Sequence, residues 1–461
     1  MIVSDPINIY FIKIYHHKYL NTFLFANTMN ITIIGSGYVG LVSGACFAEL
    51  GNEVICVDID KEKIDKLNNN IIPIYEPGLE GLVVRNNKEG RLRFTTDLKK
   101  AIKESEIIFI CVGTPPKENG EADLSYVENV ARTIAEVMDS YKLIVEKSTV
   151  PVETGEKVAK TIRAYNLDKV DFDVVSNPEF LREGNAVDDF MHPDRIVIGC
   201  ESERAKKMMK GLYEPLKAPI VFTDIKSAEI IKHASNSFLA TKISFINVIA
   251  NICELAGADI EKVAEGMGLD KRISRAFLNA GIGYGGYCFP KDAEAFIRIS
   301  EKFGYDFKLL KVVQEINSAQ RKLFTKKIER ALWVVKNKTI GILGLAFKPD
   351  TDDMRFAPSI DIVTDLQKEG AKIKAYDPKA MQKAKEILKG VVYCNNSYDV
   401  AKDADALIIV TEWNEFKELD LKRIKSLMKH PLIIDGRNIY DPEAMKNEGF
   451  IYISIGRGDK H

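Results

Sequence analysis

A cysteine lies at the end of a glycine-rich segment in the second half of the chain. Residues 281–292 read Gly-Ile-Gly-Tyr-Gly-Gly-Tyr-Cys-Phe-Pro-Lys-Asp. Pro290 suits the first turn of a helix, so Cys288 would lie at a helix N-terminus, where the helix dipole and Lys291 both favour the thiolate. Asp292 is a candidate proton carrier. A catalytic nucleophile and a structural cysteine in a tight turn both fit this segment.

Two residues on one predicted helix could assist such a thiolate. Lys232 and Asn236 are four residues apart and therefore share a helix face. An ammonium group and an amide side by side can stabilise an oxyanion. A solvated lysine beside a surface amide is the alternative.

Two polar loops directly follow predicted strands. Residues 176–184 read Ser-Asn-Pro-Glu-Phe-Leu-Arg-Glu-Gly and contain Glu179 and Glu183, four residues apart. Ser148 and Thr149 follow another strand in the same way. Ligands of doubly wound sheets lie beyond the carboxyl ends of the strands, so both loops lie at the expected ligand edge, although either could be structural.

A dinucleotide-binding motif occurs near the start of the chain. Residues 35–40 read Gly-Ser-Gly-Tyr-Val-Gly, follow an apolar strand and open a helix, and Asp58 ends the next strand. Gly35 permits the tight turn, Gly37 lets a pyrophosphate approach the backbone, and Gly40 allows close packing of helix and strand. Free N–H groups at the helix start would bind the phosphates. Asp58 would accept hydrogen bonds from ribose hydroxyls and repel a 2′-phosphate, which favours NAD over NADP.

Two α/β units must position these residues. Apolar strands alternate with helical stretches in the first half of the chain and again after residue 338, a pattern typical of doubly wound sheets. Residues 227–263 have apolar positions at helical spacing without proline, which predicts one helix of roughly 50 Å that connects domains or packs against a partner subunit. We expect strands at 31–34, 53–58, 105–112, 142–146, 172–175, 339–343, 372–376, 406–411 and 432–435.

The predicted fold class is therefore α/β, with two doubly wound Rossmann-like domains joined by a long central helix. The predicted boundaries are 1–28 for an N-terminal extension, 29–225 for the first Rossmann domain, 226–330 for a central helical domain and 331–461 for the second Rossmann-like domain.

The second α/β unit lacks the glycine motif. After Gly344, the sequence Leu-Ala-Phe-Lys-Pro places bulky side chains where the second and third glycines would be. We therefore expect that this unit does not bind a dinucleotide in the same way. Lys348, Arg355 and Arg437 could bind another phosphate group, such as a nucleoside diphosphate, or could be solvated surface cations.

Composition excludes several classes of protein. A chain of 461 residues with 46% hydrophobic and 28% charged residues predicts two or three soluble domains, and a net charge of −1 favours neither nucleic acid nor a membrane surface as partner. Seven cysteines without metal-pair spacing predict no metal site, no disulfide framework and a cytoplasmic location.

Targeting and membrane segments are not expected. No stretch approaches the ~18 apolar residues of a membrane helix, and residues 1–28 make a poor signal peptide. We expect that Met29 is the true start, with an additional surface segment as the alternative.

Together, these segments resemble the UDP-glucose 6-dehydrogenase family, within the wider UDP-sugar dehydrogenases. The resemblance extends over residues 29–456, and the matching segments follow the family's order. They are residues 35–40, 146–151, 177–184, 232–236, 283–292, 347–355 and 435–437.

The resemblance implies oxidation of UDP-glucose to UDP-glucuronate with two NAD, through a thiohemiacetal and a thioester on Cys288. It implies that Lys232 and Asn236 stabilise the developing alkoxide or oxyanion and that Asp292 handles protons. Glu179 would be the base for thioester hydrolysis, and Thr149 would order the water. A homodimer or higher homo-oligomer is also implied, with Arg272 reaching the substrate from the partner subunit.

The implied cofactor-binding residues are Gly35, Gly37, Tyr38, Val39, Gly40, Asp58, Lys63, Thr114, Ser148, Thr149, Glu183 and Arg355. The implied substrate-binding residues are Glu179, Phe180, Leu181, Lys232, Asn236, Arg272, Tyr284, Gly285, Gly286, Phe347, Lys348 and Arg437.

One departure from the family pattern concerns the sugar. The family usually has serine before the cysteine, whereas this chain has Tyr287, whose bulk would alter the sugar pocket. A UDP-N-acetyl-hexosamine 6-dehydrogenase is therefore the alternative function. A two-electron alcohol dehydrogenase and an NAD-bound regulatory protein without activity are the other hypotheses.

Overall fold

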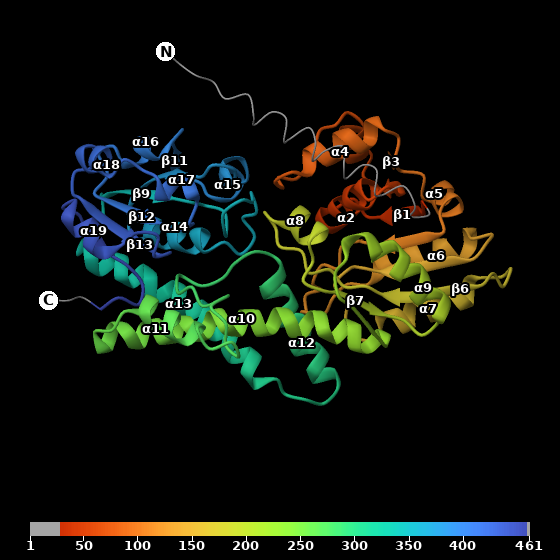
Figure 1. Cartoon of the computed structure of the whole chain (residues 1–461). Helices are drawn as coiled ribbons and strands as arrows, with labels where there is room; N and C mark the ends of the chain where they lie inside the picture. The colour runs from red at the N-terminus through yellow and green to blue at the C-terminus, as the bar shows by residue number, and fades with distance from the viewer. Residues whose placement is uncertain (1–27, 459–461) are drawn as a thin grey trace, which may run out of the picture. The chain divides into compact units, whose positions relative to one another are not determined.

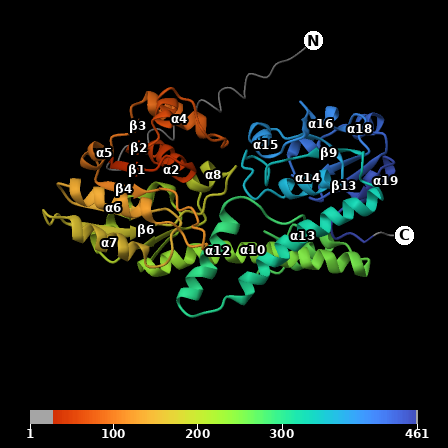
Figure 2. The same cartoon turned by 180° about the vertical axis from the view of Figure 1, so that it is seen from behind.

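The computed structural model describes residues 28–458, so the expectations for the first 27 residues lie outside it. The chain divides into two compact units. One comprises the described residues up to Pro115 together with Ala122–Lys232, and the other comprises residues 116–121 together with the chain from His233 onward. Each unit contains one sheet with helices on both faces (Figures 1 and 2). The predicted α/β class with two Rossmann-like sheets and a long helix is confirmed.

The first sheet has the strand order β3-β2-β1-β4-β5-β6-β7-β8. All of its pairs are parallel except β6 with β7. The order reverses between β1 and β4, which is where doubly wound sheets bind ligands. Its strands are β1 (Asn30–Ile34), β2 (Glu53–Val57), β3 (Leu92–Thr95), β4 (Ile107–Ile110), β5 (Lys142–Glu146), β6 (Phe172–Ser176), β7 (Ile196–Gly199) and β8 (Ile220–Thr223).

The strands of this sheet are apolar on both faces because helices cover both. Ile107 and Phe109 of β4 belong to the core beneath α2, α4, α8 and α9, whereas Ile108 and Ile110 belong to the core beneath α5, α6 and α7. Such continuous apolar runs are typical of buried parallel strands. The helices of this unit are α2 (Tyr38–Glu49), α3 (Lys61–Asn68), α4 (Leu79–Lys88), α5 (Leu98–Glu104), α6 (Ser125–Val137), α7 (Thr154–Tyr165), α8 (Ala186–Met191) and α9 (Glu203–Tyr213), followed by the short 3-10 helix η1 (Glu214–Leu216).

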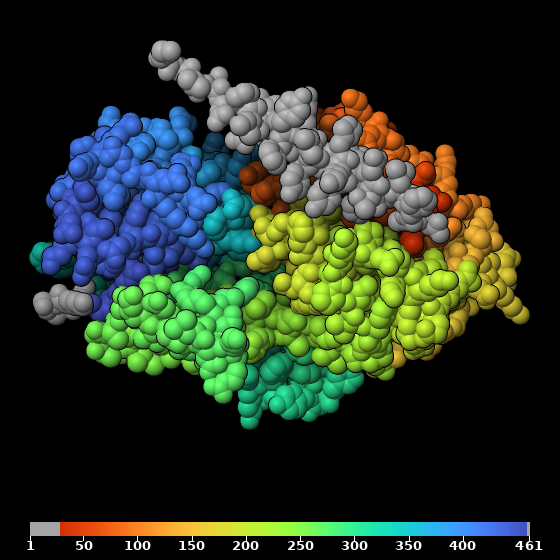
Figure 3. Space-filling model, in the orientation of Figure 1, coloured from red at the N-terminus to blue at the C-terminus, as the bar shows by residue number. Residues whose placement is uncertain are grey.

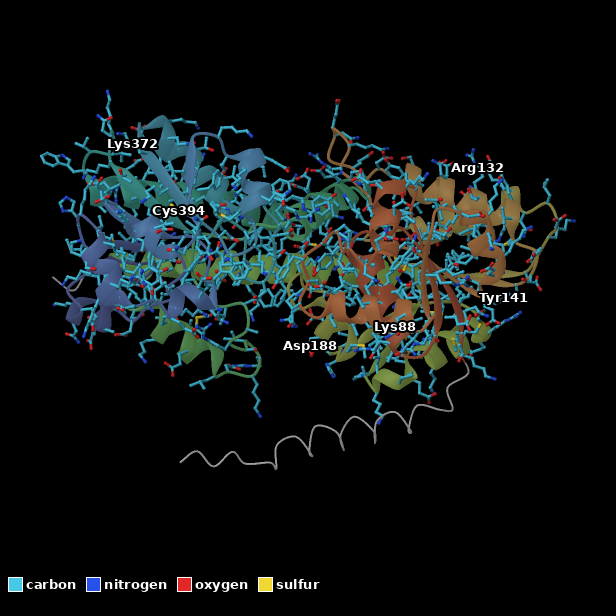
Figure 4. All side chains as sticks on the ribbon, turned by 90° about the horizontal axis from the view of Figure 1, so that it is seen from above. Lys88, Arg132, Tyr141, Asp188, Lys372 and Cys394 are labelled. Carbon is cyan, nitrogen blue, oxygen red and sulfur yellow. The ribbon has the colours of Figure 1, made fainter. Side chains whose placement is uncertain are left out.

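The second sheet repeats this topology with six parallel strands, in the order β11-β10-β9-β12-β13-β14. Cys394, labelled in Figure 4, follows β11 and belongs to one of its two cores. The strands are β9 (Thr339–Leu343), β10 (Lys372–Tyr376), β11 (Val391–Tyr393), β12 (Ala406–Ile409), β13 (Leu432–Asp435) and β14 (Ile451–Ile453). The helices are α11 (Ile260–Gly268), α12 (Cys288–Lys302), α13 (Lys308–Leu332), α14 (Pro358–Lys368), α15 (Met381–Ile387), α16 (Ser397–Ala401), α17 (Asn414–Lys417), α18 (Leu421–Leu427) and α19 (Pro442–Asn447).

The long helix α10 (Ile225–Ala256) begins in the first unit and continues into the second. It is shorter than predicted, because Gly257 has a φ of +72° and Asp259 caps a separate helix, α11. A left-handed glycine is a common helix stop. Part of α10 and α11 is at the surface (Figure 3).

The expectation that no segment could suit a membrane was wrong for α10. Within residues 28–458 this helix is long and apolar enough to cross one, by length and composition. It nevertheless carries side chains that would be costly in lipid, including the buried charged residues Glu229 and Lys232. We interpret α10 as a core helix with one exposed apolar stripe.

Candidate active site

The glycine turn after β1 is tightly packed against backbone atoms at Gly35 and Gly40 but open at Gly37. Gly35 has a φ of +99°, and a Cβ there would lie 2.7 Å from the carbonyl oxygen of Cys111. A Cβ on Gly40 would lie 1.9 Å from the carbonyl oxygen of Gly35. A Cβ on Gly37 would meet nothing within 4 Å. The turn therefore leaves open space at Gly37, at the N-terminus of α2, which fits a dinucleotide pyrophosphate.

Asp58 is held at the edge of this turn. Its Oδ2 accepts hydrogen bonds from the backbone N–H of Ser36, at 2.9 Å, and from Nζ of Lys63, at 2.7 Å. The side chain of Asp58 is only 10% exposed. A fixed carboxylate after the second strand, with an adjacent donor, suits the two hydroxyl groups of a ribose.

Glu76 connects the turn to the loop after β6, and sequence reasoning missed it. This buried carboxylate accepts hydrogen bonds from the Tyr38 hydroxyl and from the backbone N–H groups of Gly184 and Ala186, both at 2.7 Å. Burial, then the bond to Glu76, raises the pKa of Tyr38. The only signal in the sequence was an acidic residue followed by Pro-Gly and a helix. That pattern did not indicate a contact with the loop after β6.

Glu179 and Lys232 form a buried ion pair. Oε1 of Glu179 lies 2.9 Å from Nζ of Lys232, and each side chain is 5% exposed. Oε2 of Glu179 accepts the backbone N–H of Leu181 at 2.6 Å. The alternative of a solvated Lys232 is therefore wrong. A buried carboxylate with a fixed cation is equipped to receive a proton from water.

The ring of Phe180 contacts two cations. The guanidinium of Arg195 is 3.7 Å from the ring centroid, and Nζ of Lys232 is 5.4 Å from it. Cation–π attraction of this kind restrains both side chains. Arg195 was not predicted, because it follows a loop with no motif.

The Ser148–Thr149 loop is held from both ends. The hydroxyl of Thr114 donates to the carbonyl oxygen of Thr149 at 2.9 Å, and the backbone N–H of Ser148 donates to Glu146 at 2.9 Å. At the far end, Glu229 of α10 accepts the backbone N–H of Gly155 at 2.8 Å. Burial raises the pKa of Glu146 to about 8 and that of Glu229 to about 7.

In the second unit, Cys288 is the first residue of α12 and is half-buried, whereas the other six cysteines are buried. Burial raises the pKa of those six thiols, for example that of Cys111 to about 12. The start of a 15-residue helix favours the thiolate instead. Cys288 is thus the cysteine best placed to react.

Asn236 and Asp292 are adjacent, as α10 and α12 bring them together. Nδ2 of Asn236 donates to Oδ2 of Asp292 at 2.6 Å, and Nζ of Lys291 lies 3.0 Å from Oδ1 of Asp292. Asp292 is 1% exposed. A buried carboxylate one helical turn after a thiol, with two fixed donors, can hold or pass a proton.

The glycines before Cys288 pack closely against other residues of the second unit. A Cβ on Gly285 would lie 2.4 Å from the carbonyl oxygen of Phe356, and a Cβ on Gly286 would lie 2.7 Å from the Phe347 ring. The side-chain amide of Asn317, on α13, accepts a hydrogen bond from the backbone N–H of Tyr284 at 2.8 Å and donates one to its carbonyl oxygen at 3.0 Å. The glycines are required because the loop is buried.

Tyr287, the departure noted above, contacts two cations. The guanidinium of Arg355 lies 4.3 Å from the ring centroid and Nζ of Lys291 lies 5.5 Å from it. Arg355 also pairs with Asp353 at 2.7 Å, and its carbonyl oxygen accepts the N–H of Gly286 at 2.9 Å. The tyrosine therefore joins the cysteine loop to the segment that contains Arg355.

In the second unit, the glycine turn after β9 is filled by an aspartate side chain of the protein. Asp377, which is fully buried after β10, accepts the N–H groups of Leu345 and Ala346 at 2.7 and 3.0 Å and the indole N–H of Trp413 at 3.2 Å. This aspartate corresponds to Asp58 in the topology of the first sheet, but its oxygens have no access to a ribose. The turn after β9 thus presents no accessible carboxylate to a ribose.

Arg437 is mostly buried, so the alternative of a solvated cation is wrong for it. Its side chain is 13% exposed, and its guanidinium donates to the carbonyl oxygens of Val410, Gly283 and Phe347 at 2.8, 3.3 and 3.3 Å. Arg355 is 51% exposed and Arg272, paired with Asp270, is 89% exposed. Lys348 lies over the Phe347 ring at 5.7 Å.

The first unit has the glycine turn of an NAD-type dinucleotide-dependent dehydrogenase, and the second unit carries a half-buried cysteine at a helix start. Comparison with known proteins narrows the class. The NAD binding, central and UDP binding domains of the UDP-glucose/GDP-mannose dehydrogenase family match residues 29–217, 226–319 and 341–442.

UDP-glucose 6-dehydrogenase TuaD of Bacillus subtilis is 53% identical over 93% of each chain. The structure of a UDP-glucose dehydrogenase from Pyrobaculum islandicum superimposes with a TM-score of 0.87 at 38% identity, over 94% of this chain and 99% of that one. A UDP-D-ManNAc dehydrogenase from Pyrococcus horikoshii gives a TM-score of 0.82 at 31% identity, over 94% and 100%. The chain belongs to the UDP-glucose/GDP-mannose dehydrogenase family, and it is an NAD-dependent oxidoreductase.

Proposed function

We propose that the protein oxidises UDP-glucose to UDP-glucuronate with two NAD, through a thioester on Cys288. The position of Cys288 carries the proposal: it is the half-buried cysteine among seven and the first residue of α12. Eight curated relatives that are 43–53% identical to this chain are all UDP-glucose 6-dehydrogenases, which supports glucose as the sugar.

In this proposal the first unit holds NAD and the second holds the UDP moiety. The cofactor would lie against Gly37, Asp58 and Lys63, with Thr114, Ser148, Glu183 and Arg355 near its other half. Phe347, Lys348 and Arg437 would bind the nucleotide of the substrate, because a planar guanidinium and an ammonium suit a diphosphate. NAD, when bound, supplies the acceptor for each hydride.

The protein's own groups would then perform four tasks. Lys232 and Asn236 stabilise the C6 alkoxide as the alcohol becomes an aldehyde. The Cys288 thiolate adds to C6 and forms a C–S bond, and loss of the second hydride leaves a thioester. Glu179 removes a proton from a water molecule ordered by Thr149, a C–O bond forms, and the C–S bond breaks to return the thiolate. Asp292 handles the remaining protons.

The ratio of NADH formed to sugar consumed tests this function. We expect two NADH per UDP-glucose and a sugar adduct on Cys288 in the intact-protein mass spectrum during turnover. The whole reaction consumes two NAD and one water and produces the carboxylate, so any other ratio contradicts it. One NADH per sugar would indicate a two-electron alcohol dehydrogenase, and NAD binding without turnover would indicate a regulatory protein.

A UDP-N-acetyl-hexosamine is the second candidate substrate, because the structure is also similar to that of a UDP-D-ManNAc dehydrogenase. The same assay with each UDP-sugar distinguishes the two. We expect kcat/KM to be at least about tenfold higher for UDP-glucose, a difference of about 1.4 kcal/mol in the barrier. A higher value for an N-acetyl-hexosamine would contradict glucose as the substrate.

We also propose that α10 mediates a homodimer. Phe238, Phe245 and Ile252 recur every seven residues on this helix and are 65%, 48% and 53% exposed. An apolar stripe at heptad spacing is typical of a helix–helix contact. An exposed Arg272 agrees with its implied role in the site of a partner subunit.

Replacing Phe245 with aspartate should therefore convert a dimer to a monomer in sedimentation velocity, because the contact would bury unpaired charges. Leu167→Asp, at an 88% exposed position outside the stripe, should leave the mass unchanged. A dimeric F245D protein or a monomeric wild type would contradict the interface.

A further inference from the structure

The buried carboxylate of Glu76 joins two segments of the first unit and has no part in the mechanism above. Glu76 is 5% exposed. Its Oε2 accepts hydrogen bonds from the hydroxyl of Tyr38, the first residue of α2, and from the backbone N–H of Gly184. Its Oε1 accepts the backbone N–H of Ala186, the first residue of α8. One side chain thus connects Tyr38 to Gly184, which lie 146 positions apart in the sequence.

The pattern of donors around Glu76 requires a carboxylate. Three donors converge on its two oxygens, and the nitrogen of each backbone N–H lies 2.7 Å from its acceptor. A carboxylate accepts at both oxygens, whereas a glutamine amide would accept at one position and present an N–H₂ group to a donor at the other. Hydrogen bonds to a charged acceptor are also roughly twice as strong as neutral ones. The contact can therefore hold the two segments in one arrangement.

One of these segments contains Glu183, which lies between two residues whose backbones are held. On one side, Asp189 accepts the backbone N–H of Arg182 at 2.8 Å and forms an ion pair with its guanidinium. On the other side, Gly184 donates its N–H to Glu76. The backbone is therefore fixed before and after Glu183, the residue whose side chain would contact the cofactor.

The other segment is the start of α2. Tyr38 directly follows Gly37, the point at which the dinucleotide turn leaves open space. The Tyr38 hydroxyl also accepts the N–H of Gly184 at 3.2 Å, so it contacts the loop directly as well as through Glu76. The helices α2 and α8 pack in one core (Figure 1). A shift of Tyr38 would therefore move the phosphate-binding end of α2 relative to Glu183.

We propose that Glu76 is a positioning residue for the cofactor: it holds the dinucleotide turn and Glu183 in a fixed relative position, so that one NAD molecule contacts both. The inference rests on the proposed contact of Glu183 with NAD. A site whose two halves are held in place before binding loses less conformational freedom when a ligand spans them. Glu76 should therefore affect a ligand that spans both segments much more than one that reaches only the turn.

Tyr38→Phe and Glu76→Gln test the two sides of this contact. Phenylalanine removes only the hydroxyl, and glutamine removes an acceptor from a backbone N–H. We expect each variant to raise the Kd for NAD about tenfold in titration calorimetry, while the Kd for ADP, which lacks the nicotinamide half, stays within about twofold of wild type. If E76Q does not fold, the Y38F titrations decide alone.

Tyr141→Phe is the matched control for the loss of a tyrosine hydroxyl. Tyr141 directly precedes β5 and donates to Asp173 of β6 at 2.6 Å, so this bond lies at the amino edge of the same sheet. Y141F should lose a buried hydrogen bond, as Y38F does, and should change neither Kd. A loss of NAD affinity in Y141F as large as that in Y38F would overturn the inference.

Glu183→Gln shows whether the effect passes through Glu183. Adding Y38F to E183Q should raise the Kd for NAD by less than about twofold further, because both changes remove the same contact with the cofactor. Fully additive effects, equal weakening of NAD and ADP binding, or unchanged NAD binding in Y38F would each overturn the inference. An E183Q protein with wild-type affinity for NAD would contradict the Glu183 contact itself, and the inference with it. Neither titration contains a UDP-sugar, so the result does not depend on which sugar is oxidised.

Discussion

Replacing Cys288 with alanine should lower kcat for the oxidation of UDP-glucose by at least about 1,000-fold, while the Kd for NAD stays within about twofold of wild type. The alanine removes the sulfur that would form the C–S bond. It leaves the first unit, with its dinucleotide turn, unchanged. Stopped-flow measurement of NADH formation and titration calorimetry with NAD check the two halves of this expectation.

Cys394→Ala is the matched control, because Cys394, labelled in Figure 4, is a buried thiol directly after β11. It should retain near wild-type activity. Since the other six cysteines are buried, iodoacetamide should inactivate wild type through Cys288, and the modified residue can be identified by peptide mass spectrometry. A C288A enzyme that forms UDP-glucuronate at the normal rate would exclude the covalent step.

Replacing Gly37 with valine should raise the KM for NAD by about 100-fold, equivalent to about 2.8 kcal/mol, without loss of stability. Gly37 has a φ of −77°, which any residue adopts, and a Cβ there meets nothing within 4 Å. The new side chain would instead fill the space proposed for the pyrophosphate. Steady-state kinetics and a thermal melt measure the two effects.

Two glycine variants provide controls for that experiment. Gly81→Val, on α4 and likewise without neighbours within 4 Å, should change neither KM nor the melting temperature markedly. Gly40→Val should impair folding, because its Cβ would collide with the Gly35 carbonyl oxygen. If G37V binds NAD as tightly as wild type, the cofactor does not lie against this turn.

Most of the main strands could be predicted from the sequence because they are apolar runs bounded by glycine or a charge, whereas β10 mixes two lysines with apolar residues. Residues 142–146, 339–343 and 372–376 were predicted at their observed boundaries. The strands that were missed, such as β3, β8 and β11, lie at or near sheet edges and include exposed or half-buried residues. Loops have the same short, mixed patterns. These segments could therefore be recognised as strands only from their pairing in the sheets.

It was harder to predict which residues of the candidate site contact one another than which residues belong to it. The spacing of Lys232 and Asn236 suggested one helix face, but the ion pair with Glu179 depends on a contact between residues 53 positions apart. Glu76 and Glu229 were not identified, because their roles depend on burial and on distant backbone N–H groups. Charged residues without a motif cannot be assigned to such contacts from one sequence.

The position of Asp377 affects the order of cofactor binding and release within each catalytic cycle. Because this carboxylate fills the second turn, we expect a single dinucleotide site within residues 28–458, at the glycine turn of the first unit, despite two sheets of the same topology. A reaction that consumes two cofactor molecules per sugar must then empty and reload that single pocket halfway through each cycle. The half-oxidised sugar has to stay attached during the exchange, so covalent capture by sulfur would also prevent escape of a free aldehyde.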